Sequence, residues 1–206
     1  MFKSIGNEES TYIILSGVAS AECYLASGEV VIIELLGKGY SIGEFEPFLQ
    51  QKIYYVIQAL TPVIVCQLDK VDLAQLIEEN PIHLLHITSA MENNMRSFAR
   101  HSWVMNAQRI QERIKRLLSN LVILSGGSGE ETRIDLTHEE LARLINTDRT
   151  SVTRGLHRLE KEGFVRLGYD RLWVVNPLIS KELTTEFRFD PLARNISNLA
   201  IDRLKR

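Results

Sequence analysis

The first third of the chain alternates short apolar runs with glycine-containing turns. From Tyr12 to Leu68 these runs are YIILSG, VASAECYLASG, EVVIIELLGKG, YSIGEF, YYVIQAL and PVIVCQL. Runs of this length, rich in β-branched residues and ended by turn residues, are typical of strands. Many short strands at such spacing predict a small β-barrel or jelly roll. The stretch from Asp69 to Asn80 then fits a short helix that Pro81 ends.

A long amphipathic helix is predicted to begin at Pro81. Its apolar stripe recurs at spacings of three and four and consists of Leu84, Ile87, Met91, Met95, Phe98, Ser102 and Met105. Such a stripe is nearly a coiled-coil seam, and it can pack on the chain's own β-rich part or on a second copy. The length of the stripe and its methionines favour a homodimer. The pattern breaks around Trp103 to Ala107, a candidate hinge, and a new amphipathic helix is predicted from Gln108 to Leu124.

Residues 136 to 160 fit two short helices joined by a tight turn. Thr137 is placed to cap the first helix, and Glu140, three residues later, to complete a capping box. Leu136 and Leu141 occupy the two positions of a hydrophobic staple. The start of this first helix is therefore well marked.

The second of these helices has two faces of opposite character. Asn146 tolerates the left-handed turn conformation, and Asp148 is placed to cap the helix. One face carries Val152, Leu156 and Leu159, and the other carries Thr150, Thr153, Arg154 and His157, flanked by Arg149 and Arg158. Hydroxyl and guanidinium groups suit base edges and phosphates in the major groove, so the pattern predicts a DNA-reading helix-turn-helix. The alternative is a surface hairpin whose arginines contact only solvent.

Two predicted strands follow directly, FVRL from Phe164 and LWVV from Leu172, with a turn between them. A two-stranded wing at this place indicates the winged form of the motif, with Arg166 and Arg171 near phosphates. The residues predicted to contact DNA are Thr137, His138, Asp148, Arg149, Thr150, Ser151, Thr153, Arg154, His157, Arg158, Arg166 and Arg171.

Charge is distributed unevenly over the 206 residues. The overall net charge is −2, but residues 1–95 hold four Lys, no Arg and twelve acids, whereas residues 96–206 hold twenty basic residues and fourteen acids. The two parts are thus about −8 and +6. Because DNA repels acidic surfaces and attracts basic ones, a nucleic-acid surface is expected in the second part.

Catalytic and metal chemistry find no support in the sequence. Cys23 and Cys66 form no CxxC pair and are expected to be buried thiols. The five histidines are His83, His86, His101, His138 and His157, and all lie outside the β-rich runs. Metal ligands, haem ligation and a cupin-type metalloenzyme are therefore not predicted. With no phosphate loop, signal peptide or membrane-length apolar run, we expect a cytoplasmic protein that is not an enzyme.

Taken in order, these parts resemble the CRP/FNR family of bacterial transcription regulators, from about Gly6 to Pro177. The most specific pieces are GYSIGE at residues 39–44, similar to the family's turn in the effector-binding β-roll, and RTSVTR at residues 149–154, similar to its recognition-helix signature. The resemblance implies that Arg154 reads a guanine edge and that Arg149 holds a phosphate or base. Thr150 stands where many relatives have glutamate, so the half-site is expected to depart from the TGTGA type there.

The resemblance places an effector pocket at Gly43, Glu44, Lys52, Tyr54 and Phe98. Members that respond to cyclic AMP grip the cyclic phosphate with an Arg-Ser pair, but this chain reads KIYY from Lys52 and has no arginine before Arg96. A lysine point charge does not replace a bidentate arginine contact. Phe98 and Ala99 also stand where those members place hydroxyls for the purine. We therefore expect no cyclic AMP binding, predict no cofactor and leave the effector open.

The expected fold class is α+β, with a cyclic-nucleotide-binding-like β-roll, a long dimerisation helix and a C-terminal winged helix-turn-helix. The expected divisions are a β-roll at 1–80 that lacks the first strands, a dimer helix and hinge at 81–107, a DNA-binding part at 108–180 and a helical extension at 181–206.

The predicted function is a homodimeric regulator that binds a pseudo-palindromic operator in double-stranded DNA without cyclic AMP, with RNA polymerase as a further candidate partner and no membrane contact. The alternatives are an effector- or protein-binding module with vestigial DNA binding, and a sequence-independent architectural DNA binder.

Overall fold

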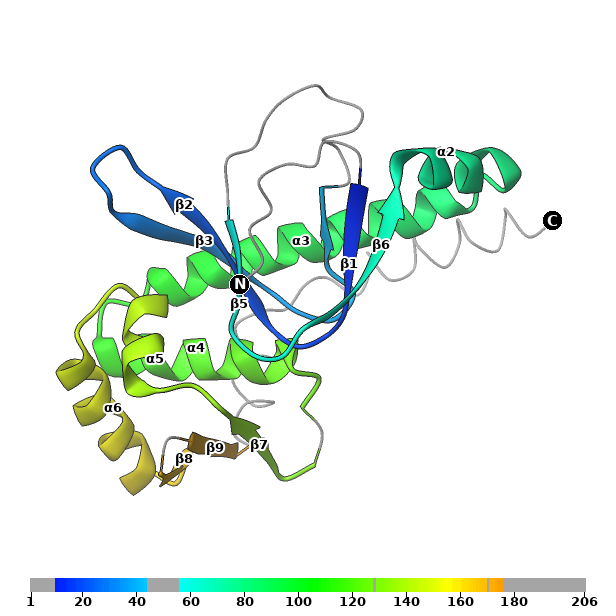
Figure 1. Cartoon of the computed structure of the whole chain (residues 1–206). Helices are drawn as coiled ribbons and strands as arrows, with labels where there is room; N and C mark the ends of the chain where they lie inside the picture. Colours follow the sequence, from blue (N-terminus) through cyan, green and yellow to red (C-terminus); the bar gives the residue numbers. More distant parts are fainter. Residues whose placement is uncertain (1–9, 44–55, 128, 170, 176–206) are drawn as a thin grey trace.

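The computed structural model describes residues 10–43, 56–127, 129–169 and 171–175 (Figure 1). In chain order its elements are β1 (Ser10–Ser16), β2 (Ala19–Tyr24), β3 (Val30–Leu36), β4 (Ser41–Ile42), β5 (Val56–Ala59), β6 (Ile64–Asp69), α2 (Lys70–Glu79), α3 (His83–Met105), α4 (Ile110–Leu124), β7 (Glu131–Ile134), α5 (His138–Leu144), α6 (Arg149–Lys161), β8 (Val165–Gly168) and β9 (Arg171–Val175).

Strands β1 to β6 form a β-roll of two three-stranded antiparallel sheets, ordered β4-β1-β6 and β3-β2-β5. Ile14, Leu35, Leu36 and Ile57 are buried in its core. Strands form within all six apolar runs, as the sequence predicts. Helix α2 is flanked by Asp69 and Asn80 as caps, which matches the predicted limits. The expectations of missing first strands and of a C-terminal helix lie outside the described residues.

Helix α3 is attached to the β-roll by polar side chains on one face. Asn94 Nδ2 donates to the Ser41 carbonyl oxygen at 2.8 Å, and the Ser97 hydroxyl donates to the Leu35 carbonyl oxygen. One turn further, His101 Nε2 lies 3.0 Å from the Ile32 carbonyl oxygen. Ser97, His101 and Val104 are the buried residues of the helix. Of the predicted apolar stripe, Leu84, Met95 and Phe98 are exposed. Ile87, Met91 and Met105 are partly buried, and Met105 packs against the chain's own core.

The second part of the chain is a winged unit, which we define as α4 to β9. Its core gathers Ile114, Leu117 and Leu118 of α4 with Leu156 of α6 and Phe164. Gly155 of α6 lies against α4, since a Cβ there would be 2.4 Å from Ile114 Cδ1. Figure 1 shows this unit at one end of the molecule, with α2 at the other.

The wing is larger than the sequence predicts. Strands β8 and β9 form the expected hairpin, but β7 adds a third strand in the order β7-β9-β8. The pattern of β7 is a short alternation in which Thr132 and Ile134 are buried while Glu131 and Arg133 are exposed. Four residues next to a glycine-rich loop carry too weak a periodic signal for a sequence-based assignment.

Candidate nucleic-acid interface

The first helix of the motif begins as the sequence predicts. Thr137 Oγ1 accepts from the Glu140 backbone N–H at 3.2 Å, and Glu140 Oε2 accepts from the Thr137 N–H at 2.7 Å. The capping box is therefore complete. Leu136 and Leu141, the predicted staple residues, are both buried. These contacts satisfy helix-end donors and fix the angle at which the chain enters α5.

The turn into α6 also has the predicted geometry. Asn146 has φ of 49°, in the left-handed region, and Asp148 is the N-cap of α6. Its Oδ1 accepts from the Ser151 N–H at 2.8 Å and its Oδ2 from the Ser151 hydroxyl at 2.6 Å. These hydrogen bonds, the side-chain one first, lower the pKa of Asp148. Asp148 and Ser151, two of the residues predicted to contact DNA, are therefore hydrogen-bonded to each other at the cap of α6.

Helix α6 separates a buried face from an exposed one. Val152, Leu156 and Leu159 are fully buried. The exposed residues include Arg149, Thr150, Arg154, His157 and Arg158. Among the described residues, the guanidinium groups of Arg149 and Arg154 have no hydrogen-bond or ion-pair partner. This exposed face, named here the reading face, is the part of α6 that is available to a ligand.

His138 and Thr153 form a contact that the sequence does not reveal. The Thr153 hydroxyl donates to the Arg149 carbonyl oxygen at 2.9 Å, and His138 Nδ1 lies 2.9 Å from the same hydroxyl. Because a hydroxyl has one hydrogen, the imidazole donates from Nδ1. Thr153 is therefore held against its own helix, and His138 places the first turn of α5 beside the reading face.

The two wing arginines differ in their surroundings. Arg166 Nη2 pairs with Glu131 Oε2 at 2.8 Å, and its guanidinium lies 4.0 Å above the Trp173 ring centroid. The hydrogen bond from Arg166 lowers the pKa of Glu131 and raises that of the arginine. Arg171 pairs in register with Gly168 at the tip, beside the exposed Tyr169. Arg171 is the more available of the two for a phosphate.

The predicted effector residues are only partly described. Gly43 has φ of 83°, as a tight turn requires, but Glu44, Lys52 and Tyr54 lie outside the described residues. Phe98 is 56% exposed, although its neighbour Ser97 is buried against β3. Within one chain Phe98 therefore belongs with the exposed stripe of α3.

Within the described ranges, no group of three or more metal-ligating side chains is found.

Three arginines that carry no signal in the sequence connect distant segments. Arg143 of α5 reaches Glu22 of β2, Arg100 of α3 reaches α4, and Arg113 of α4 bonds the carbonyl oxygens of Ala107 and Ile145. No local pattern marks such residues, because their partners are far away in sequence.

In the part of the chain that the structure describes, no helix has the length and apolar character of a membrane span.

The fold and this exposed helix define a class of protein, the winged helix-turn-helix regulators with a cyclic-nucleotide-binding-like β-roll. A family model described as a cyclic nucleotide-binding domain matches residues 4–80, and one described as a Crp-like helix-turn-helix domain matches residues 112–177. The chain belongs to the CRP/FNR family of transcription regulators. It is a regulator with a helix-turn-helix DNA-binding domain, not an enzyme.

Individual relatives agree with this assignment. The transcriptional regulator SdrP of Thermus thermophilus is 27% identical over 180 residues, which cover 86% of this chain and 85% of that protein. The cyclic AMP receptor protein of the same organism is 26% identical over 160 residues, covering 78% and 72%. A CRP-family regulator of known structure, also from Thermus thermophilus, is 19% identical and has the same fold, with a TM-score of 0.68 over 88% of this chain and 91% of that one.

Proposed function

We propose that the protein binds a pseudo-palindromic operator as a homodimer and reads each half-site with α6. The reading face carries this proposal, because Arg149 and Arg154 extend freely from a helix whose opposite face is fully buried. Bidentate guanidinium groups are the commonest readers of guanine in the major groove. The capped start of α6 holds them in a fixed orientation.

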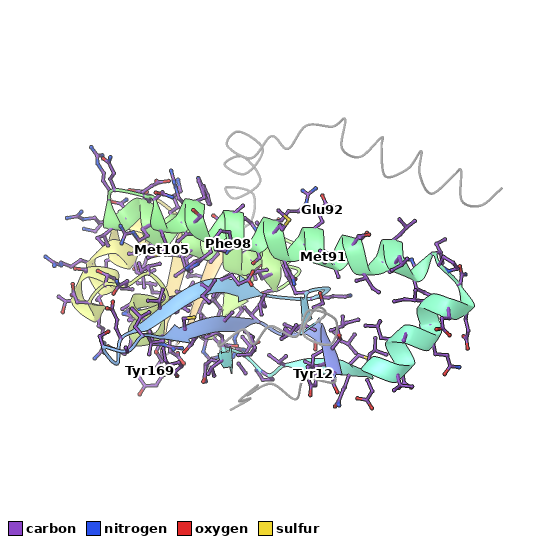
Figure 2. The ribbon with its side chains drawn as sticks, turned by 90° about the horizontal axis from the view of Figure 1, so that it is seen from above. Tyr12, Met91, Glu92, Phe98, Met105 and Tyr169 are labelled. Atoms are coloured by element: carbon purple, nitrogen blue, oxygen red, sulfur yellow. The ribbon has the colours of Figure 1, made fainter. Side chains whose placement is uncertain are left out.

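The α3 stripe supports the homodimer. Leu84, Met95 and Phe98 are 47%, 73% and 56% exposed in a single chain. Figure 2 shows Met91, Phe98 and Met105 spaced along the helix. Exposed apolar side chains at several turns of one helix fit a self-complementary two-fold contact. In such a dimer residues 81–107 provide the interface and the two winged units lie apart.

Cyclic AMP is not part of the proposed mechanism. Two relatives, one 26% and one 22% identical, have cyclic AMP in their names. This chain, however, has no arginine before Arg96 to grip a cyclic phosphate. We expect sub-millimolar cyclic AMP to change neither the melting temperature nor DNA affinity, because a ligand stabilises only the state that it binds. A saturable rise in melting temperature would remove cyclic AMP independence from the proposal.

RNA polymerase remains a candidate partner, and a role on bacterial DNA implies a cytoplasmic protein.

Selection from random double-stranded DNA tests the proposal directly. We expect enriched sequences with two inverted half-sites about 10 base pairs, or roughly 34 Å, apart. Salt-dependent binding without sequence preference would instead indicate an architectural binder. Absence of DNA binding by the folded protein would favour an effector- or protein-binding module.

A further inference from the structure

The winged unit is joined to the β-roll by a partly buried ion pair. Arg143 Nη1 of α5 lies 2.7 Å from Glu22 Oε1 of β2, and the two residues are 121 positions apart. Glu22 is only 2% exposed, and the same oxygen accepts from the Ser20 hydroxyl at 2.7 Å. A carboxylate withdrawn from water needs charged or hydrogen-bonding partners. Arg143 supplies the only ion pair to Glu22 among the described residues.

A second contact brings the same two parts together at their backbones. Gly37 follows β3, and a Cβ built on it would lie 2.7 Å from the Leu124 carbonyl oxygen and 2.9 Å from Leu124 Cβ. Leu124 is the last residue of α4. No side chain fits at Gly37 unless α4 moves away from the β-roll. This close approach depends on packing alone and is independent of charge.

A third contact passes through α3. Arg100 donates to the Tyr40 hydroxyl and, through Nε, to Asn120 Oδ1 at 3.2 Å. Tyr40 belongs to the β-roll and Asn120 to α4, and both side chains are buried. Burial raises the pKa of Tyr40, so its hydroxyl stays neutral. Arg100 therefore links the β-roll, the long helix and the winged unit.

These contacts leave the reading face uncovered. Arg143 lies in the last turn of α5, whereas His138, which contacts Thr153 of α6, lies in the first. Arg149 and Arg154 remain exposed while Arg143 is bound to Glu22. Figure 1 agrees, since α6 is further from β2 and β3 than α5 is. The docked arrangement is thus compatible with DNA binding.

We propose that Glu22, Arg143 and Gly37 are positioning residues that hold the winged unit against the β-roll in the orientation that binds DNA. This inference rests on the proposed DNA-reading function. If the contact between the winged unit and the β-roll is loosened, only a fraction of the molecules is in the orientation that binds DNA. The apparent dissociation constant for DNA is then the intrinsic one divided by that fraction. Affinity should therefore fall equally for all operator variants, with base preference unchanged.

The test uses full-length Glu22→Gln, Arg143→Gln and Gly37→Ala variants on a selected operator. We expect affinity losses of roughly three- to tenfold, since the competent population falls by the same factor. The Glu22→Gln/Arg143→Gln double variant should bind DNA no more weakly than the weaker-binding single variant, because both substitutions remove the same interaction. Arg133→Gln serves as the control, because Arg133 pairs with Asp135 inside the winged unit and should leave affinity unchanged.

Trypsin cleavage after Arg109 gives a readout that needs no DNA. Arg109 is exposed and lies between α3 and α4, so undocking should accelerate cleavage there in all three single variants. Arg143 is the more exposed partner of the ion pair with Glu22. If Arg143→Gln and Gly37→Ala both keep the wild-type DNA affinity and the wild-type rate of cleavage after Arg109, the proposal is wrong. Tighter DNA binding by them would also overturn it, since the docked state would then be inhibitory. Failure of the reading function shows separately, as loss of base preference in the wild-type protein.

Discussion

At the residue scale, the arginines of the second part of the chain that the structure describes differ in their surroundings. Arg149 and Arg154 are exposed without an ion-pair partner among the described residues, Arg166 is paired with Glu131 and stacked on Trp173, and Arg143 joins two parts of the chain. A guanidinium that is already paired must leave its partner before it binds a phosphate. Residue type alone therefore overestimates the number of arginines available to DNA.

Arg154→Ala should remove a base contact on α6. We expect a cost of about 1 to 3 kcal/mol per contact and relaxed preference at one position of each half-site. Arg171→Ala in the wing should weaken binding to all sequences alike and reduce the salt slope by about one unit. Titrations of operator variants at several salt concentrations separate the two effects. Unchanged affinity and preference in Arg154→Ala would exclude α6 as the reading helix.

His101 gives the fold a defined dependence on pH. Burial lowers the pKa of His101 from its ordinary value near 6.5, so the folded protein favours the neutral imidazole. The unfolded chain then binds more protons below pH 6.5, and stability falls between that pH and the lower folded pKa. Unfolding by denaturant at several pH values should show this fall, and His101→Gln should reduce it. The exposed His86→Gln is the control, and an identical pH dependence in His101→Gln would contradict the assignment.

At the element scale, the sequence predicts what local chemistry determines. The capping box at Thr137, the left-handed Asn146 and the cap at Asp148 are confirmed, because each involves residues within a few positions of one another. The third wing strand was missed, since β7 depends on pairing with β9 some forty residues later. The Glu22–Arg143 pair is likewise a product of tertiary structure. No local pattern in either segment indicates its partner.

Thr137→Ala should destabilise the winged unit through one helix end. The substitution removes the hydroxyl that accepts from the Glu140 N–H, and loss of such a cap costs about 0.5 to 2 kcal/mol. The melting temperature and the denaturation midpoint measure the effect. Thr147→Ala is the matched control. Thr147 lies in the turn just before α6, and its side chain makes no hydrogen bond in the described part of the chain. Equal stabilities of the two variants would show that the capping box contributes nothing.

At the scale of the whole molecule, α3 has one face bonded to its own β-roll and one face exposed. Phe98→Glu places a charge on the exposed face, and a single chain tolerates it because Phe98 is 56% exposed there. We expect the variant to fold but to dissociate, since an unpaired charge is costly within an apolar seam. Sedimentation equilibrium compares it with Asn93→Glu, which lies on α3 off the stripe. A Phe98→Glu protein that remains dimeric would rule out the stripe as the interface.

The bonds between α3 and the strands have an evolutionary consequence. Asn94, Ser97 and His101 all bond to main-chain atoms, the backbone of Ser41 and the carbonyl oxygens of Leu35 and Ile32. Main-chain groups persist whatever side chains the strands carry. Substitutions in β3 and β4 can therefore accumulate without releasing the helix, provided that the strand backbone is kept. Such an attachment allows the side chains of the roll to diverge within a lineage while the contacts between the roll and the long helix stay the same.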